Sequence, residues 1–266
     1  MNHPAETGLE PYVIATRSGG VTTLTLNRPA QFNALSEAMM DALEAELDLA
    51  SSDEQVRVIV IAAAGKAFCA GHDLRQMLDH PDEAYYAALF ARCAKLMLKI
   101  QSLPQPVIAR VQGVATAGGC QLVAACDLAV AADTARFAVS GINLGLFCST
   151  PAVPLSRNLP RKAAFEMLVT GEFIDAAAAR TRGLVNQVVP ADALDAEIGR
   201  IAALICAKPA EAIAIGKSLF YRQLEMGTAA AYQLAGQTMA CNLIADYAQE
   251  GVKAFTEKRK PAWAAG

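Results

Sequence analysis

The pattern of apolar and polar positions begins with a predicted β-hairpin. Two runs rich in β-branched residues, Tyr12–Arg17 and Val21–Leu26, are separated by Ser18-Gly19-Gly20, and a glycine-containing turn between such runs is typical of a hairpin. Threonine and leucine alternate in the second run. We therefore expect one face of that strand to be buried and the other to be wet.

Two amphipathic helices are predicted next. Ser36 is a typical N-cap residue, and apolar residues follow it at every fourth position, which predicts a helix to about Ser52. A longer helix is predicted over Asp82–Ser102, because the proline-containing segment 103–106 would stop it there.

Three continuous apolar runs predict strands that are buried on both faces. They are Val56–Ala63, Val107–Val111 and residues 127–132, and such runs are typical of parallel sheets. A glycine-bearing loop follows each of the first two, at residues 65–74 and 113–121, and the second loop leads into a short apolar helix that ends near Cys126. The order strand, loop, helix, strand predicts an α/β protein.

Helices dominate the chain beyond about residue 160. The pattern predicts a single further strand, Val185–Val189, and helices at 161–169, 175–182, 193–205, 210–225, 228–244 and 249–258. The interpretation is an α/β core followed by a helical C-terminal part. That part would pack against the core or against a neighbouring subunit.

Composition and charge exclude several classes of protein. The chain has 266 residues, of which 54% are hydrophobic and 18% charged, so a folded core is expected in place of disorder. Its apolar runs are far shorter than the ~20 residues of a membrane helix, so no membrane partner is predicted. A net charge of −3 argues against a general nucleic-acid binder, although a local basic patch stays open.

The cysteines and histidines indicate reduced thiols and no metal centre. Seven scattered cysteines with no CxxC pair fit neither a disulfide framework nor a zinc site. His72, Asp73, Asp79 and His80 are too loosely spaced to predict a metal site. The first ten residues resemble neither a secretory signal nor a transit peptide, so the sequence predicts a cytoplasmic protein.

Glycines at the two loops are the strongest indication of chemistry. Gly118 and Gly119 open the helix after the second loop, and the free N–H groups at a helix N-terminus attract negative charge. One N–H from each loop would form an oxyanion hole. The alternative, which the residues alone leave open, is that the glycines only allow a helix and a strand to pack closely.

Several motifs in combination resemble the crotonase (enoyl-CoA hydratase/isomerase) superfamily. The resemblance covers about Tyr12 to Trp263. Its motifs are Leu26-Asn27-Arg28-Pro29 with Asn33-Ala34-Leu35, then residues 66–74 (KAFCAGHDL), Gly118-Gly119-Cys120 ahead of Cys126-Asp127, 160–164 (PRKAA), 168–171 (LVTG), 183–186 (GLVN) and 254–261 (AFTEKRKP).

This resemblance implies a fold and an assembly. The fold would be a spiral of ββα units, with residues 1–200 forming the core that carries an acyl-CoA site. Residues 201–266 would be a helical C-terminal region for trimerisation and CoA contact. The family usually assembles as homotrimers or dimers of trimers. The partner molecule would be an acyl-CoA thioester, with coenzyme A as part of the substrate and no separate cofactor.

The resemblance also assigns site residues. The two oxyanion donors would be the backbone N–H groups of His72 and Gly118, while the imidazole of His72 is either a bystander or a general acid or base. Asp73 has an alternative role as a helix cap, and the basic run at 258–260 as a solvated helix end. The residues implied in CoA or substrate contact are Arg28, Ala30, Ala70, Asp73, Leu74, Phe255 and Lys258.

The chain departs from the family at two positions. Hydratases of this family use two glutamates to handle water, and here Gln121 and Gly141 stand at the matching positions. Glutamine holds a water but does not exchange a proton at neutral pH. The segment 141–151 resembles a divergent "enoyl-CoA hydratase domain-containing" subgroup, and Cys148 within it is either a pocket thiol or a buried apolar residue.

Three functions follow from these residues. The first is a hydratase- or isomerase-like enzyme that has weak or altered hydratase activity and retains Gln121 at the first glutamate position. The second is a decarboxylase or other enolate chemistry on acyl-CoA, since loss of CO₂ needs no general base. The third is a non-catalytic acyl-CoA-binding protein.

Overall fold

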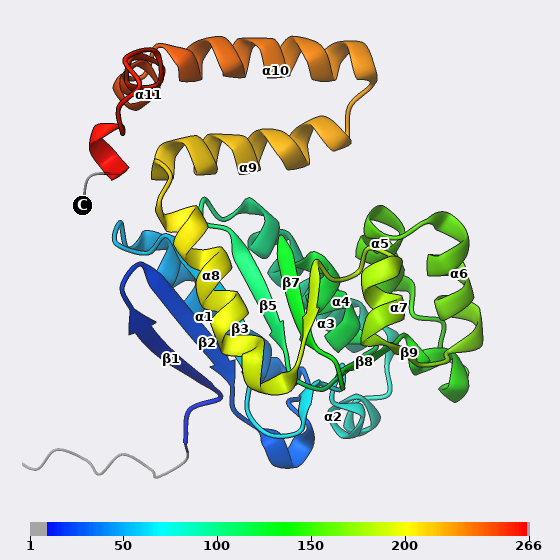
Figure 1. The fold of residues 1–266 in the computed structure, drawn as a ribbon. Helices are drawn as coiled ribbons and strands as arrows, with labels where there is room; N and C mark the ends of the chain where they lie inside the picture. The colour runs from blue at the N-terminus through cyan, green and yellow to red at the C-terminus, as the bar shows by residue number, and fades with distance from the viewer. Residues whose placement is uncertain (1–9, 265–266) are drawn as a thin grey trace, which may run out of the picture.

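Six strands form the larger of two sheets, in the order β1-β2-β3-β5-β7-β10 (Figure 1). The computed structural model describes residues 10–264. The first two strands are antiparallel, as the predicted hairpin requires, and the others are parallel. Their bounds are Val13–Ser18 (β1), Val21–Leu26 (β2), Val58–Ala63 (β3), Val107–Val111 (β5), Leu128–Ala132 (β7) and Gln187–Val189 (β10).

Four shorter strands form a second sheet, in the order β4-β6-β8-β9. They are Ala67–Cys69 (β4), Val114–Thr116 (β6), Arg136–Ala138 (β8) and Ile174–Asp175 (β9). Successive strands alternate between the sheets, because β3, β5 and β7 join the large sheet while β4, β6 and β8 join the small one. This alternation is the spiral of ββα units, and it confirms the predicted fold class. The sequence pattern did not predict the small sheet.

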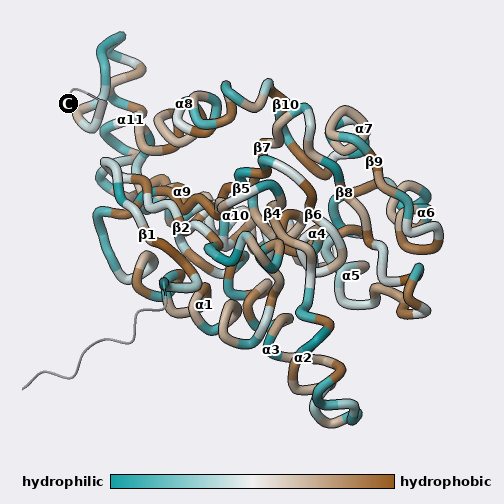
Figure 2. The backbone as a smooth tube through the Cα atoms, turned by 90° about the horizontal axis from the view of Figure 1, so that it is seen from below, coloured by the Kyte–Doolittle hydropathy of each residue, from teal (hydrophilic) through white to brown (hydrophobic). Residues whose placement is uncertain are grey.

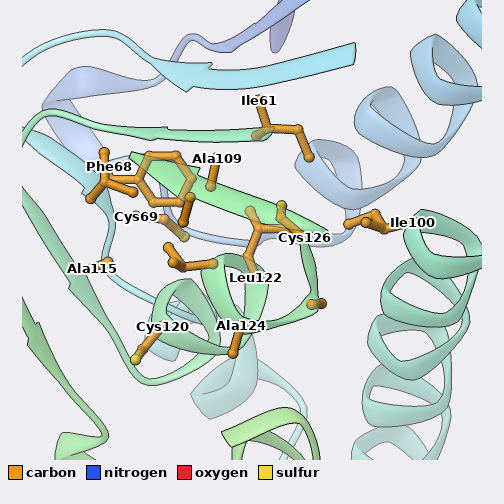
Figure 3. Close-up of a cluster of buried hydrophobic side chains, with 14 of the residues drawn as sticks. Ile61, Phe68, Cys69, Ile100, Ala109, Ala115, Cys120, Leu122, Ala124 and Cys126 are labelled. Atoms are coloured by element: carbon orange, nitrogen blue, oxygen red, sulfur yellow. The ribbon is translucent and has the colours of Figure 1, made fainter. Parts of the chain in front are cut away.

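Helices cover both faces of the large sheet (Figure 1). One face packs against α1 (Glu37–Ser52), α3 (Glu83–Ser102) and α4 (Gly118–Ala125), and the other packs against α8 (Leu194–Cys206). Every residue of β3 is buried, which confirms the predicted burial on both sides. Figure 3 shows part of the core between the sheets and α4, where Phe68, Leu122 and Cys126 lie together.

Side-chain caps begin the two predicted amphipathic helices. Ser36 Oγ accepts a hydrogen bond from the N–H of Met39 at 3.2 Å, and Asp82 Oδ1 accepts one from the N–H of Tyr85 at 2.8 Å. Each bond satisfies an N–H that has no partner inside the helix. Both predicted helices are therefore confirmed, with α1 ending at Ser52 and α3 at Ser102.

Four helices and three short 3-10 segments complete the body, and a fourth 3-10 segment lies at the C-terminal end of the described chain. The helices are α2 (Leu74–Asp79), α5 (Ser149–Asn158), α6 (Arg161–Thr170) and α7 (Ala176–Thr181). The 3-10 segments are η1 (Pro29–Gln31), η2 (Ser140–Leu144), η3 (Ala191–Ala193) and η4 (Ala262–Ala264). The predicted elements at 161–169 and 175–182 are confirmed, whereas α2 and α5 were not predicted.

The last three long helices extend from the body as a stacked arm (Figure 1). They are α9 (Ala210–Leu224), α10 (Thr228–Leu243) and α11 (Asp246–Thr256). The predicted domain boundary after residue 200 falls within α8, so the division into 1–200 and 201–266 stays a prediction. Within residues 10–264, no helix combines the length and apolar character needed to cross a membrane.

Candidate functional site

Pairing of two short strands brings the two glycine-bearing loops together. In the small sheet β4 lies parallel to β6, with Ala67 opposite Val114 and Cys69 opposite Ala115. The carboxyl ends of neighbouring parallel strands meet at one edge of a sheet. His72, which follows β4, and Gly118, which follows β6, therefore lie side by side at that edge.

A backbone hydrogen bond sets the direction of the His72 N–H. The carbonyl of Gly71 accepts the N–H of Leu35 at 2.7 Å. In a trans peptide the C=O and N–H point in opposite directions, so the N–H of His72 points away from Leu35. Gly71 has a φ of +93°, and a Cβ there would lie 2.9 Å from the N of Gly118. Glycine is therefore required for this approach of the loops.

A strained residue precedes the Gly118 donor. Ala117 has a φ of 49° and a ψ of −120°, a conformation that costs ~1–3 kcal/mol for a non-glycine residue. Its N–H donates to the carbonyl of Ala138 in β8 at 3.0 Å, so the neighbouring strand holds the turn. Helix α4 begins at the next residue, and its first N–H groups have no partner within the helix.

The two glycines that open α4 differ in what they do. A Cβ on Gly119 would lie 2.1 Å from the carbonyl oxygen of Cys69, so this glycine is needed for α4 to pack against β4. A Cβ on Gly118 would meet Leu35 Cδ1 at 3.3 Å and Gly71 Cα at 3.4 Å, which is tight contact without overlap. Close packing, the open alternative from the sequence, therefore accounts for Gly119 more fully than for Gly118.

A cavity of about 300 Å³ opens beside these N–H groups. Four of its lining residues, Ala70, His72, Leu74 and Gly118, belong to the predicted site. We call it the His72 cavity. Among the described residues that line it there is no Asp, Glu, Lys or Arg. The cavity is therefore mostly apolar, with a few hydroxyl, thiol and imidazole groups.

The side chain of His72 borders this cavity. The ring packs edge-on against Phe90 of α3, with 5.4 Å between the ring centroids. Neither ring nitrogen has a hydrogen-bond partner among the described residues, and both nitrogens are buried. Burial lowers the pKa of His72, and the nearby Leu35 backbone opposes this shift in part.

Cys148 also lines the cavity. Cys148 is 7% exposed, and burial raises the pKa of its thiol. Cys148 belongs to the buried apolar core and also lines the cavity, so both readings that the sequence left open describe it. The raised pKa means that the thiol is neutral at physiological pH.

The resemblance implies glutamates at positions 121 and 141, and the structure places the two residues found there in different surroundings. Gln121 is 3% exposed, does not line the His72 cavity, and its Oε1 has no hydrogen-bond partner. Gly141 does line the cavity, but a Cβ there would lie 2.7 Å from both Cys148 Sγ and the carbonyl oxygen of Leu146. A glutamate at 141 therefore requires the 141–148 loop to move.

Two other predicted residues line a second cavity, of about 490 Å³, which we call the Arg28 cavity. The Arg28 guanidinium stacks 3.7 Å from the centroid of the Tyr12 ring and donates to the carbonyls of Glu10 and Pro11 at 2.7 and 3.0 Å. Asp73 Oδ1 accepts the N–H of Arg75 at 3.0 Å. Asp73 therefore caps α2, as its alternative role required, while also lining this cavity.

Three predicted contact residues lie outside both cavities. Ala30 is exposed in η1. Phe255, on α11, is 84% exposed, and Lys258 follows the same helix with a φ of 55°. Helix α2 borders the His72 cavity. Figures 1 and 2 both place α11 at the opposite end of the molecule from α2. The chain therefore does not bring Phe255 or Lys258 to its own cavity.

Sequence reasoning missed several lining residues. They are Met77 and Phe90 from α2 and α3, Ser140 and Leu144 from η2, and residues 146, 147 and 149–151 around the start of α5. Ser140 Oγ lies 2.8 Å from Thr116 Oγ1, which ties η2 to β6. The available signal was the family-divergent segment 141–151, of which only Gly141 and Cys148 were singled out. Among residues 10–264, no group of three or more His, Cys, Asp or Glu is placed to hold a metal ion.

Comparison with solved structures finds close relatives over nearly the whole length. The chain is 62% identical to an enoyl-CoA hydratase from Mycobacterium smegmatis, with a TM-score of 0.94 over 96% of this chain and 99% of that one. It is 44% identical to human enoyl-Coenzyme A hydratase domain-containing protein 3, with a TM-score of 0.92 over 95% of this chain and all of that one.

A curated relative corrects the predicted location. Enoyl-CoA hydratase domain-containing protein 3 from Xenopus laevis is 47% identical over 253 residues, which are 95% of this chain and 86% of that protein, and it is named as mitochondrial. The prediction of a cytoplasmic protein is therefore wrong. The prediction was drawn from reduced cysteines and from the first ten residues, and reduced cysteines fit any reducing compartment without separating one from another.

The family is settled by a match along most of the chain. The profile of the enoyl-CoA hydratase/isomerase family matches residues 16–266. The relatives described above agree with it in sequence and in fold. The chain belongs to the enoyl-CoA hydratase/isomerase family.

Proposed function

We propose that the protein binds acyl-CoA thioesters and polarises the thioester carbonyl between the N–H groups of His72 and Gly118. The observation that supports this is the pair of N–H groups at one end of the His72 cavity. One is directed by the Leu35–Gly71 hydrogen bond and the other stands at the start of α4. Preorganised donors of this kind stabilise the negative charge of an enolate, and each contributes ~10²–10³-fold to rate.

The proposed reaction type is that of a lyase or isomerase with weak hydration. Adding water to an enoyl thioester requires groups that take a proton from water and give one to carbon. Each positioned acid or base contributes ~10²–10⁴-fold, and no carboxylate is found among the described residues that line the cavity. We expect turnover of crotonyl-CoA far below hundreds per second.

Restoring glutamates at positions 121 and 141 is expected to fail at residue 141. Replacing both Gln121 and Gly141 by glutamate would restore the family's two carboxylates. The Cβ of residue 141 would collide with the Leu146 carbonyl, so we expect this double variant to lose stability without gaining hydration.

Calorimetric titration with butyryl-CoA, coenzyme A and butyrate tests the proposal. The thioester should bind more tightly than either fragment. Gly118→Pro removes one donor and should weaken thioester binding, whereas Gly118→Ala keeps the N–H and is the matched control. Circular dichroism shows whether each variant folds. Equal affinity for butyryl-CoA and butyrate would refute the proposal.

Decarboxylation is the second candidate function. Loss of CO₂ from a 2-carboxyacyl-CoA also produces an enolate but needs no base, and the cavity without carboxylates suits it. Release of CO₂ from methylmalonyl-CoA would support this candidate. Tight acyl-CoA binding without any product would support a purely binding protein.

The CoA moiety is proposed to enter as part of the substrate, with no separate cofactor. Arg28, Ala30 and Asp73 would lie along its path, and Ala70 and Leu74 beside the acyl chain. Phe255 and Lys258 are far from the cavity of their own chain, so we propose that they reach the CoA of a neighbouring copy in a homotrimer or dimer of trimers. A mass of 28.0 kDa by light scattering, which is that of a single chain, would contradict that assembly.

A further inference from the structure

The His72 side chain is the least satisfied polar group of the cavity. Both ring nitrogens are buried without a hydrogen-bond partner among the described residues, which is costly for a group that has one donor and one acceptor. Phe90 packs against the ring edge-on and offers no hydrogen bond. Because both nitrogens have almost no accessible surface, the ring must turn before a ligand in the cavity can supply the missing partner.

The ring stands next to the proposed oxyanion donors. Its Cδ2 lies 3.6 Å from the position that a Cβ on Gly118 would occupy. The imidazole, the N–H of the same residue and the start of α4 therefore border one part of the cavity. A thioester whose oxygen lies on the two N–H groups has its α-carbon one bond away from the carbonyl carbon, within the same region.

Only one other titratable side chain lines the cavity in the described chain. It is the Cys148 thiol, whose pKa is raised by burial. Asp73 and Arg75, the charged residues next along the chain, line the Arg28 cavity, and α3 presents Phe90 to the ring. With its pKa lowered by burial, the imidazole is neutral at pH 7 and holds a lone pair, so it is the base that a turn of the ring would present to the cavity.

We propose that the His72 imidazole removes and returns the α-proton of a bound acyl-CoA, in place of a glutamate. This inference rests on the proposed acyl-CoA function. The C–H bond at C2 breaks, the proton passes to a ring nitrogen, and the electron pair forms an enolate whose oxygen is held by the N–H groups of His72 and Gly118. No oxidant, metal or water is consumed.

A single base of this kind fits a double-bond shift better than hydration. In a 3-enoyl-CoA, removal of the proton at C2 gives a dienolate, and return of the same proton at C4 gives the conjugated 2-enoyl-CoA. The base is regenerated and the atoms balance. Hydration would require a second group to activate water, and no carboxylate is present among the described lining residues.

The test follows conversion of 3-hexenoyl-CoA to 2-hexenoyl-CoA by the absorbance of the conjugated thioester. His72→Ala and His72→Gln both keep the backbone N–H, and His72→Gln also keeps polar bulk. We expect each to lower kcat by ~10²–10⁴-fold, while the Kd for hexanoyl-CoA changes by no more than about threefold. The wild-type rate should fall as the pH drops and the imidazole becomes protonated, whereas the residual rate of His72→Gln should not follow that titration.

Each outcome supports or overturns the proposal. Hexanoyl-CoA binding with no conversion by the wild-type protein, or with conversion unaffected in His72→Gln, overturns this inference alone. Loss of conversion in Cys148→Ala with retention in His72→Ala assigns the proton to the thiol and also overturns it. Failure of hexanoyl-CoA to bind the wild-type protein overturns the proposed function together with this inference.

Discussion

The large sheet and the small sheet have different roles, one in stability and the other in aligning the site. β3 of the large sheet has six residues, all buried, whereas β4 and β6 of the small sheet have three each and β9 has two. Long buried strands supply apolar area, and burial of that area provides most of the folding free energy. The short strands bury little, but they align the two loops that carry His72 and Gly118.

The difference teaches where changes should affect stability and where they should affect the site. The ends of the large sheet are tied to the helical arm by buried charges. The segments that follow β4 and β6 of the small sheet contain the close glycine contact at Gly119, the strained Ala117 and the unsatisfied His72. Strain of this kind is characteristic of functional sites.

The largest expected effect is at the large sheet, where a buried ion pair joins α9 to the core. Lys217 Nζ contacts Asp127 Oδ2 at 2.6 Å and donates to the carbonyls of Ile100 and Gln105. Removing one charge of a buried pair costs ~3–5 kcal/mol. Lys217→Met should therefore lower the free energy of unfolding by that amount in urea denaturation.

A second variant tests the reason for this loss. Lys217→Met combined with Asp127→Leu leaves no isolated charge and should recover part of the stability. Acyl-CoA turnover per folded molecule should stay unchanged in Lys217→Met, because the pair lies outside both cavities. A loss below 1 kcal/mol would mean that the arm is not held by this pair.

Residue patterns predicted the large sheet because its strands are long enough to show them. Val56–Ala63 is a continuous apolar run, and the Ser18-Gly19-Gly20 turn separates two clear strands. Strands of two or three residues are too short to show an alternation of apolar and polar positions, so the sequence pattern could not predict the small sheet. Helix α5 was missed because Pro151 and Pro154 lie within it, and proline normally argues against a helix.

The site was predicted unevenly for a similar reason. His72, Gly118, Ala70 and Leu74 carry a recognisable motif, and the structure places all four around one cavity. Phe90 came from the middle of a long amphipathic helix, where an aromatic residue looks like any core residue. Contacts set by tertiary packing, such as that between its ring and His72, leave no local signal in the sequence.

The next effect compares two glycine-to-alanine changes, one in each region. At Gly119 the new Cβ would meet the Cys69 carbonyl at 2.1 Å, whereas at Gly199 of α8 nothing lies within 4 Å. Gly119→Ala should destabilise by ~1–3 kcal/mol through overpacking. Gly199→Ala should stabilise by up to ~1 kcal/mol, because alanine favours a helix interior. Thermal unfolding of both variants checks the contrast, and equal shifts would contradict it.

A smaller gain is expected from Ala117→Gly. Glycine adopts a φ of 49° without the steric cost that alanine has there, so the variant should be more stable by about 1 kcal/mol. The same change loosens the turn that holds the Gly118 N–H, and acyl-CoA binding should weaken. Calorimetry and urea denaturation measure the two effects on one protein sample. A variant that loses stability would show that Ala117 is not strained.

The smallest expected effect is the dependence of stability on pH at His72. Burial places its folded-state pKa below the ordinary value of about 6.5, so folding favours the neutral ring. Between pH 6.5 and the folded-state pKa the unfolded chain binds more protons, and stability therefore falls as the pH falls. The slope is at most ~1.4 kcal/mol per pH unit, and it vanishes above pH 6.5 and below the folded-state pKa.

In the difference between wild type and His72→Gln, titrations elsewhere in the protein cancel. Urea denaturation of both proteins at about pH 7.5 and about pH 5.5 should show wild type losing more stability on acidification. Equal losses would mean that the imidazole is solvated, and the small sheet would then hold no buried base.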